Sequence, residues 1–254
     1  MITEIFQDSF KYTFKDKKAF IKLGTISLFS FLIMPIFLLF GYSYRIVSTG
    51  LQGVMINSKD PLPKITPISP LLKEGLKIFL VISIYSILSI ALTILIFSNT
   101  ELINIIGTHS NFSITLNTGT FFLMLLLIIW FIPFLFIAVA IPHMIENNEL
   151  KSAFKIKELI KIINFFGITK YIKFYIITII LIIISLIITF LISQGIINMI
   201  NYLLTTIQNH SSSLIISYLN ITVFILLELC IVIPFFTILL SRTISFMYDP
   251  TPIE

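Results

Sequence analysis

Residues 78–97 read IFLVISIYSILSIALTILIF, an apolar run without a charged side chain. An α-helix of about 20 residues rises about 30 Å, which is the thickness of the hydrocarbon core of a bilayer. Three further runs have the same character, at residues 121–141, 174–201 and 214–240. The sequence therefore predicts an all-α, polytopic transmembrane bundle with four clear spans. We expect residues 1–254 to form a single integral membrane domain.

The composition excludes a water-soluble globule. Of the 254 residues, 57% are hydrophobic and 11% are charged, and the mean hydropathy is +1.05. Too few polar side chains remain to cover a surface in water. The formal net charge is +5, but the basic residues alternate with apolar ones at the edges of the spans. The expected partners are therefore anionic lipid headgroups on the cytoplasmic side, and nucleic acid is not expected.

All 17 Lys and Arg residues can be placed on one side of the membrane. They occur in residues 1–22, 45–77 and 151–173 and at Arg242, whereas residues 98–120 and 204–213 carry none. Positively charged segments stay in the cytoplasm during insertion. We expect a multi-pass protein of the cell membrane whose basic loops and C-terminus are cytoplasmic.

One apolar segment conflicts with this orientation. Residues 23–44 are long enough to span, yet a simple crossing would place the five N-terminal lysines outside. The lysine bias favours a re-entrant hairpin or a broken helix that bends near Pro35, which sits in the middle of the segment. A simple span that violates the charge rule is the alternative.

Two segments have the pattern of amphipathic helices in the membrane interface. In residues 1–18 the apolar side chains follow helical spacing, and the charged ones, Asp8 among them, fall largely on the other side. Residues 150–164 repeat this pattern with lysines on the polar face. The predicted apolar faces are Ile2, Ile5, Phe6, Phe10 and Phe14 in the first helix, and Leu150, Ala153, Phe154, Leu159, Ile160 and Ile163 in the second.

A short motif recurs three times. The tetrapeptides that begin at Met34, Ile132 and Ile233 each place a proline second, within an apolar run. A basic or potentially basic residue follows the proline eight to ten positions later, at Arg45, His143 and Arg242 respectively. The motif predicts successive helical hairpins that exit toward the basic side; chance in so apolar a chain is the alternative.

Glu228 is the most informative single position, because it lies inside the last span, where a charged carboxylate costs on the order of 3 kcal/mol. Ser217 and Asn220 share its helical face, and Gln194 and Asn198 belong to the preceding span. One interpretation is a polar path for protons or small solutes. The favoured one is a hydrogen-bonded glutamate that helps two helices associate.

The remaining polar side chains indicate no reaction. Lys151, Lys155, Lys157 and Lys161 are candidates for binding lipid headgroups, although a positive-inside anchor explains them as well. The three histidines are isolated in the sequence, and Cys230 is the only cysteine. Because no catalytic or metal-binding motif is found, we expect a non-enzymatic protein without a cofactor or metal.

Several stretches resemble one family over nearly the whole chain. They are GYSYRIVSTGLQG from residue 41, DPLP from residue 60, KEGLKIFLV from residue 73, LKSAFKIKEL from residue 150, GITKYI from residue 167 and SRTISFMY from residue 241. The family, domain of unknown function 4013, consists mainly of archaeal integral membrane proteins. A fainter similarity is to the membrane domain of some glycerophosphodiester phosphodiesterases. That domain is not the catalytic part, so the similarity implies no active site here.

These observations favour a non-enzymatic scaffold or lipid-handling component of the membrane. The alternative is a small transporter or channel that uses the polar residues around Glu228.

Overall fold

The computed structural model describes residues 2–52, 62–98, 112–207 and 213–248, and these residues are helical without any strand. Four helical segments are long and apolar enough to cross a membrane: Ile68–Leu95, Ile129–Glu146, Ile168–Tyr202 and Tyr218–Met247. The chain is therefore a multi-pass helical membrane protein, as predicted.

The spanning helices extend beyond the predicted apolar runs. They are α4 (Ile68–Ser98), α6 (Phe112–Glu146), α8 (Ile168–Ile207) and the continuous pair α9 (Ser213–Leu227) and α10 (Ile233–Met247). Residues 112–120, which precede the predicted span at 121–141, are the first turns of α6. A helix satisfies its own backbone hydrogen bonds, so it can continue through polar residues outside the hydrocarbon core.

The first apolar segment is a hairpin. Helix α2 (Lys17–Leu28) and helix α3 (Ile33–Leu51) are joined by the turn at residues 29–32. Pro35 lies in the first turn of α3, where a missing N–H does little harm, so the break precedes the proline.

Contacts with the last span show how the hairpin is placed along it. Gly24 of α2 packs on Cys230, halfway along the last span, whereas Gly50 at the end of α3 packs on Ser245 near its end. Tyr12, just before α2, contacts Arg242 at that same end. Both ends of the segment thus lie toward one end of the last span, which is the arrangement expected of a re-entrant hairpin.

The core lies where α3 crosses its neighbours. Helix α3 packs against α4, α6 and α10. A Cβ atom added at Gly41 would fall on the carbonyl oxygen of Leu71, and one at Gly75 would fall on that of Phe37. Only residues without a side chain let the backbones of α3 and α4 approach so closely.

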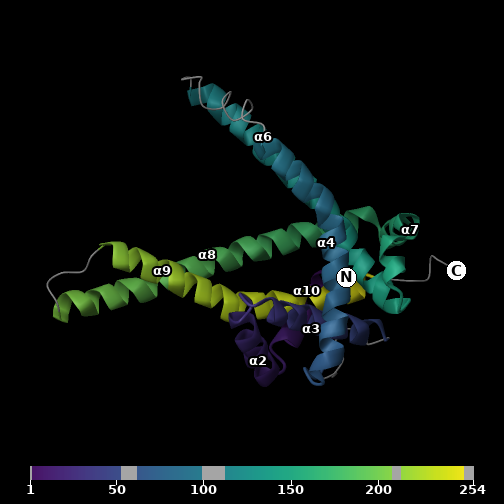
Figure 1. Cartoon of the computed structure of the whole chain (residues 1–254), viewed down its shortest axis with the longest axis horizontal. Coiled ribbons are helices and arrows are strands. Elements are labelled where there is room, and N and C mark those ends of the chain that lie inside the picture. Colours follow the sequence, from purple (N-terminus) through teal and green to yellow (C-terminus); the bar gives the residue numbers. More distant parts are fainter. Residues whose placement is uncertain (1, 53–61, 99–111, 208–212, 249–254) are drawn as a thin grey trace.

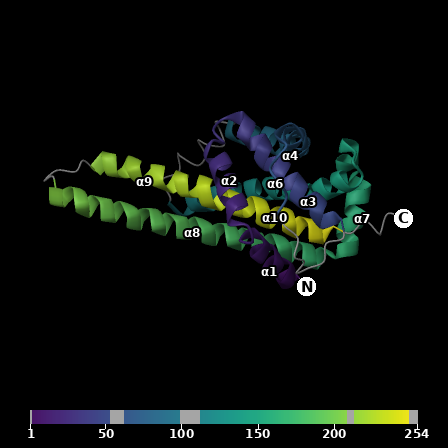
Figure 2. The same ribbon diagram turned by 90° about the horizontal axis from the view of Figure 1, so that it is seen from below.

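The long helices diverge from this common base. Figure 1 shows α6 pointing away from α8 and α9, which run alongside each other. Figure 2 shows α1 (Ile2–Thr13) beside α8 at the base, near α7 (Ile156–Phe166). The molecule therefore has a packed basic end, and its spans separate away from that end.

The two predicted interfacial helices bury part of their predicted apolar faces, including Ile5 and Phe6 in the first and Ala153 and Leu159 in the second. Phe10 of α1 and Phe14, which follows α1, are half exposed, and Asp8 is buried against α10. The second segment is split into a 3₁₀ turn, η1 (Leu150–Phe154), and α7. This change of helix type shifts the register, so that Leu159, Ile162 and Phe166 are buried and Ile160 is exposed.

Candidate functional site

The basic residues that follow the three prolines each contact a carboxylate on another helix. Arg45 of α3 places its Nε 2.8 Å from Oε2 of Glu74 on α4. Its Nη atoms donate to the backbone carbonyl groups of Lys64, Thr66 and Pro67, at 2.6–3.2 Å. Arg45 thus fixes the segment that leads into α4.

His143 is buried at the end of α6. Its Nε2 lies 3.0 Å from Oε2 of Glu158 on α7, and its Nδ1 lies 2.8 Å from the hydroxyl of Tyr248. Glu158 also contacts Lys155, at 3.2 Å. Desolvation acts to raise the pKa of Glu158, but hydrogen bonds from His143 and Lys155 outweigh it and hold that pKa below its ordinary value. The sequence had suggested that His143 is isolated. In the structure its side chain instead joins three segments.

Arg242 of α10 is the largest fully buried side chain, with 0% exposure. Its Nε lies 3.4 Å from Oδ2 of Asp8 on α1, and its guanidinium carbon lies 4.5 Å from the ring centroids of both Tyr12 and Phe246. Aromatic faces on both sides favour the cation. Asp8 was expected on the polar face of α1 and instead closes this contact.

Together the three contacts form a cycle around the base. Arg45 on α3 pairs with Glu74 on α4, and His143 on α6 pairs with Glu158 on α7. Arg242 on the last helix, α10, pairs with Asp8 on the first helix, α1. The helices that carry them, α3, α6 and α10, contact one another. Across the described ranges, no group of three or more His, Cys, Asp or Glu side chains is arranged to hold a metal ion. The three contacts each join two helices of the packed end.

Glu228 opens a π-helical turn, η2 (Glu228–Val232), in the last span. Pro234 has no N–H to donate to the carbonyl of Cys230, four residues earlier, and a wider turn accommodates this loss. The side chain of Glu228 accepts a hydrogen bond of 2.6 Å from the hydroxyl of Thr189 on α8. The carboxyl group thus joins the last two spans.

Among the described side chains, the other candidates for a polar path make no hydrogen bond with Glu228, and they differ in their exposure. Asn198 is exposed and Gln194 is partly buried on α8. Asn220 is partly buried on α9, and its Oδ1 has no hydrogen-bond partner. Ser217 is in α9, but its side chain lies outside the described part of the structure. The partner of Glu228, Thr189, was not among the predicted residues.

The four candidate lysines project outward from η1 and α7. Lys151, Lys157 and Lys161 are exposed, and Lys155 is half exposed while it contacts Glu158. They form a basic outer rim of the packed end.

An apolar cleft opens where α6 and α8 diverge. It has a volume of about 390 Å³ and is bounded by α6, α8 and α10. The hydroxyls of Tyr171 and Tyr175 donate to the carbonyls of Leu135 and Phe134, which ties α8 to α6 at its base. Thr178 also lines the cleft; its hydroxyl oxygen is buried and has no hydrogen-bond partner. Other lining residues are Trp130, Ala138, Phe174, Ile179, Leu240 and Ile244.

A second cavity continues this cleft toward the centre. It has a volume of about 490 Å³, is lined by α3, α4, α6 and α10, and shares Ile141, Leu240 and Ile244 with the first. Both volumes fall within the roughly 300–1,000 Å³ of small-molecule sites. We call the two together the inter-hairpin cleft.

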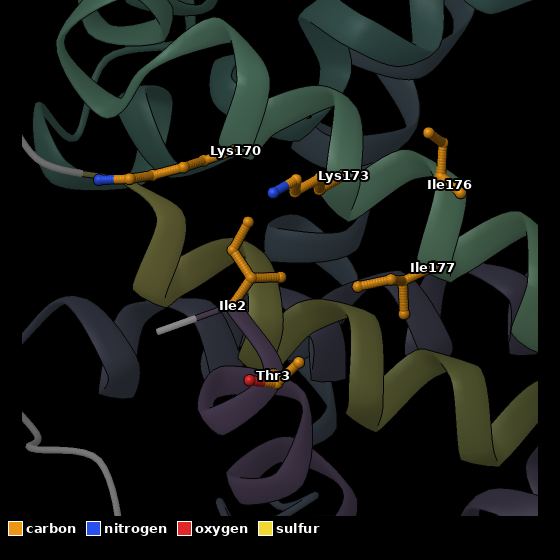
Figure 3. Close-up of a pocket in the computed structure, with 6 residues that line it drawn as sticks. All are labelled: Ile2, Thr3, Lys170, Lys173, Ile176 and Ile177. Atoms are coloured by element: carbon orange, nitrogen blue, oxygen red, sulfur yellow. The ribbon is translucent and has the colours of Figure 1, made fainter.

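A smaller pocket of about 350 Å³ lies on the α1 side of α8. Lys170 and Lys173 stand above it, and Ile176 and Ile177 follow on the same helix. Ile2 and Thr3 of α1 form the opposite wall (Figure 3). Both lysines belong to the basic stretch seen in the sequence, but its spacing gave no sign that α1 would face them.

The chain belongs to the family described as protein of unknown function (DUF4013), whose model matches residues 28–194. No curated protein matches the chain. No solved structure matches it either.

Proposed function

We propose that this DUF4013 protein is a non-enzymatic, lipid-handling protein of the cell membrane, with its basic segments and C-terminus in the cytoplasm. The inter-hairpin cleft is the observation that carries this proposal. It lies among the spans, and its lining is mostly apolar. At that depth lipid chains are the abundant apolar molecules, so a lipid chain is the occupant that fits.

The charge distribution supports the same function. Lysines surround the packed end from which the cleft opens, and each basic residue near the membrane surface favours anionic lipid by about 1 kcal/mol. The cytoplasmic orientation rests on the positive-inside rule applied to these lysines.

The test is retention of lipid by the purified protein. Ala138 lines the cleft, and Ala138→Trp would fill it, whereas Ala91 is exposed on α4 and Ala91→Trp is the matched control. After extensive delipidation in detergent, native mass spectrometry should detect bound lipid on the unaltered protein and on Ala91→Trp. It should detect little on Ala138→Trp. A protein that carries no lipid, or equal retention by all three, would contradict the proposal.

The transporter alternative has weaker support. It rests on Glu228 and the unpartnered Oδ1 of Asn220, but the carboxyl group of Glu228 is engaged by Thr189.

A further inference from the structure

We propose that the pocket between α1 and α8 binds the phosphate group of an anionic phospholipid, with Lys170 and Lys173 as its cationic contacts and Thr3 as a hydroxyl contact. This inference rests on the proposed function and assigns a headgroup site that is separate from the inter-hairpin cleft.

The order of side chains along α8 matches the order of groups in a phospholipid. Lys170 and Lys173 are three residues apart, so they lie on one side of the helix. Ile176 and Ile177 come one turn further toward the membrane core. A phosphate held at the lysines would therefore place the first carbons of its acyl chains against the isoleucines.

Both lysines line the same pocket. Figure 3 shows the side chains of Lys170 and Lys173 running in the same direction above Ile2. The Nζ of Lys170 lies over the ring of Phe166, 5.9 Å from the centroid, a cation–π contact at the edge of the pocket. Lysine binds phosphate as a point charge, which suits a diester that can rotate.

The opposite wall is held in place by buried contacts. Arg242 contacts Asp8, the hydroxyl of Thr243 contacts that of Ser9 at 3.0 Å, and the ring of Phe6 stacks on Phe174 of α8. These contacts lie one to two turns from Ile2 and Thr3. The position of Thr3 opposite the lysines is therefore a consequence of how α1 docks.

The experiment measures binding of short-chain phosphatidylglycerol to the full chain in detergent micelles. The double variant Lys170→Gln, Lys173→Gln should bind roughly thirtyfold more weakly, since each lysine contributes about 1 kcal/mol. Lys17→Gln, Lys18→Gln is the matched control, because it removes the same charge from exposed positions on α2 that do not line the pocket. It should change affinity by less than about threefold. Thr3→Val should produce a smaller loss than the lysine pair.

Two further ligands distinguish a phosphate that belongs to an anionic lipid from one that belongs to a zwitterionic lipid or a soluble molecule. Short-chain phosphatidylcholine should bind more weakly than phosphatidylglycerol, and soluble glycerol phosphate should not compete. Equal losses in the two lysine pairs would show a diffuse charge effect and overturn the site. Binding of glycerol phosphate alone would overturn the lipid assignment.

The outcome is independent of the cleft. If lipid retention depends on Ala138 while the Lys170 and Lys173 variant binds normally, only the headgroup site fails. If no lipid is retained by any form, the proposed function itself fails.

Discussion

Removal of the Asp8 carboxylate should destabilise the protein by about 3 kcal/mol. Breaking a buried ion pair typically costs roughly 3–5 kcal/mol, because one charge stays buried without its partner. Arg242 has 0% exposure and Asp8 6%. The Nε to Oδ2 distance of 3.4 Å is longer than the roughly 2.8 Å of a strong charged hydrogen bond, and the rings of Tyr12 and Phe246 retain part of the cation's stabilisation. Both facts place the cost at the lower end of the range.

The assay is a double-mutant cycle on the free energy of unfolding in mixed micelles. Asp8→Asn and Arg242→Met are the single variants, and their combination removes both charges. The double variant should recover at least about 2 kcal/mol of the summed single losses, because neither charge then remains buried. Lys155→Gln is the control: its pair with Glu158 is 50% and 29% exposed, so its loss should cost less than about 1 kcal/mol. If Asp8→Asn costs no more than Lys155→Gln, or if the cycle is additive, Arg242 does not depend on Asp8.

Three other perturbations test separate parts of the molecule. Gly41→Ala should force α3 away from α4 and lower the melting temperature by several degrees. Gly195→Ala has no atom near its added Cβ, so it should leave the melting temperature unchanged or raise it. Equal effects of the two substitutions would refute the close crossing. Because His143 and Lys155 lower the pKa of Glu158 in the folded state, its stabilisation is present above the ordinary value of 4.5 and is lost as the pH falls through the folded value. The difference in melting temperature between the unaltered protein and Glu158→Gln should therefore shrink in acid, and a constant difference would contradict the contact. Thr189→Val should cost roughly 0.6–1.7 kcal/mol in unfolding free energy, the range for hydrogen bonds between membrane helices, while Glu228→Gln keeps an acceptor and should cost less. Abolition of a solute flux by Glu228→Gln in proteoliposomes would instead support the transporter.

The spans and the re-entrant segment could be predicted because each depends on one local property. Apolar length alone identifies a span, and the distribution of lysines alone opposes a simple crossing by residues 23–44. The turn lies at residues 29–32 rather than at Pro35, since a proline is tolerated in the first turn of a helix. Local sequence therefore located the hairpin to within a few residues of its turn.

The contacts of the basic end could not be predicted, because their partners are distant in sequence. Arg45 and Glu74 are 29 residues apart, His143 and Glu158 are 15 apart, and Arg242 and Asp8 are 234 apart. The proline motif marked the three basic residues, but it carried no information about which carboxylate each would meet. Helical periodicity even assigned Asp8 to the polar face, because it counts a charged residue as solvent-facing wherever its partner lies.

The cyclic order of these pairs bears on the repeat hypothesis and on the proposed lipid site together. The order of these pairs fits three copies of one unit, each donating an acid to its neighbour. In such a ring the third unit must return to the first helix, which is the contact between Arg242 and Asp8. That contact also docks α1 and so sets Thr3 opposite Lys170 and Lys173. Loss of the Asp8 carboxylate should thus weaken both the fold and the headgroup pocket, although Asp8 does not line it.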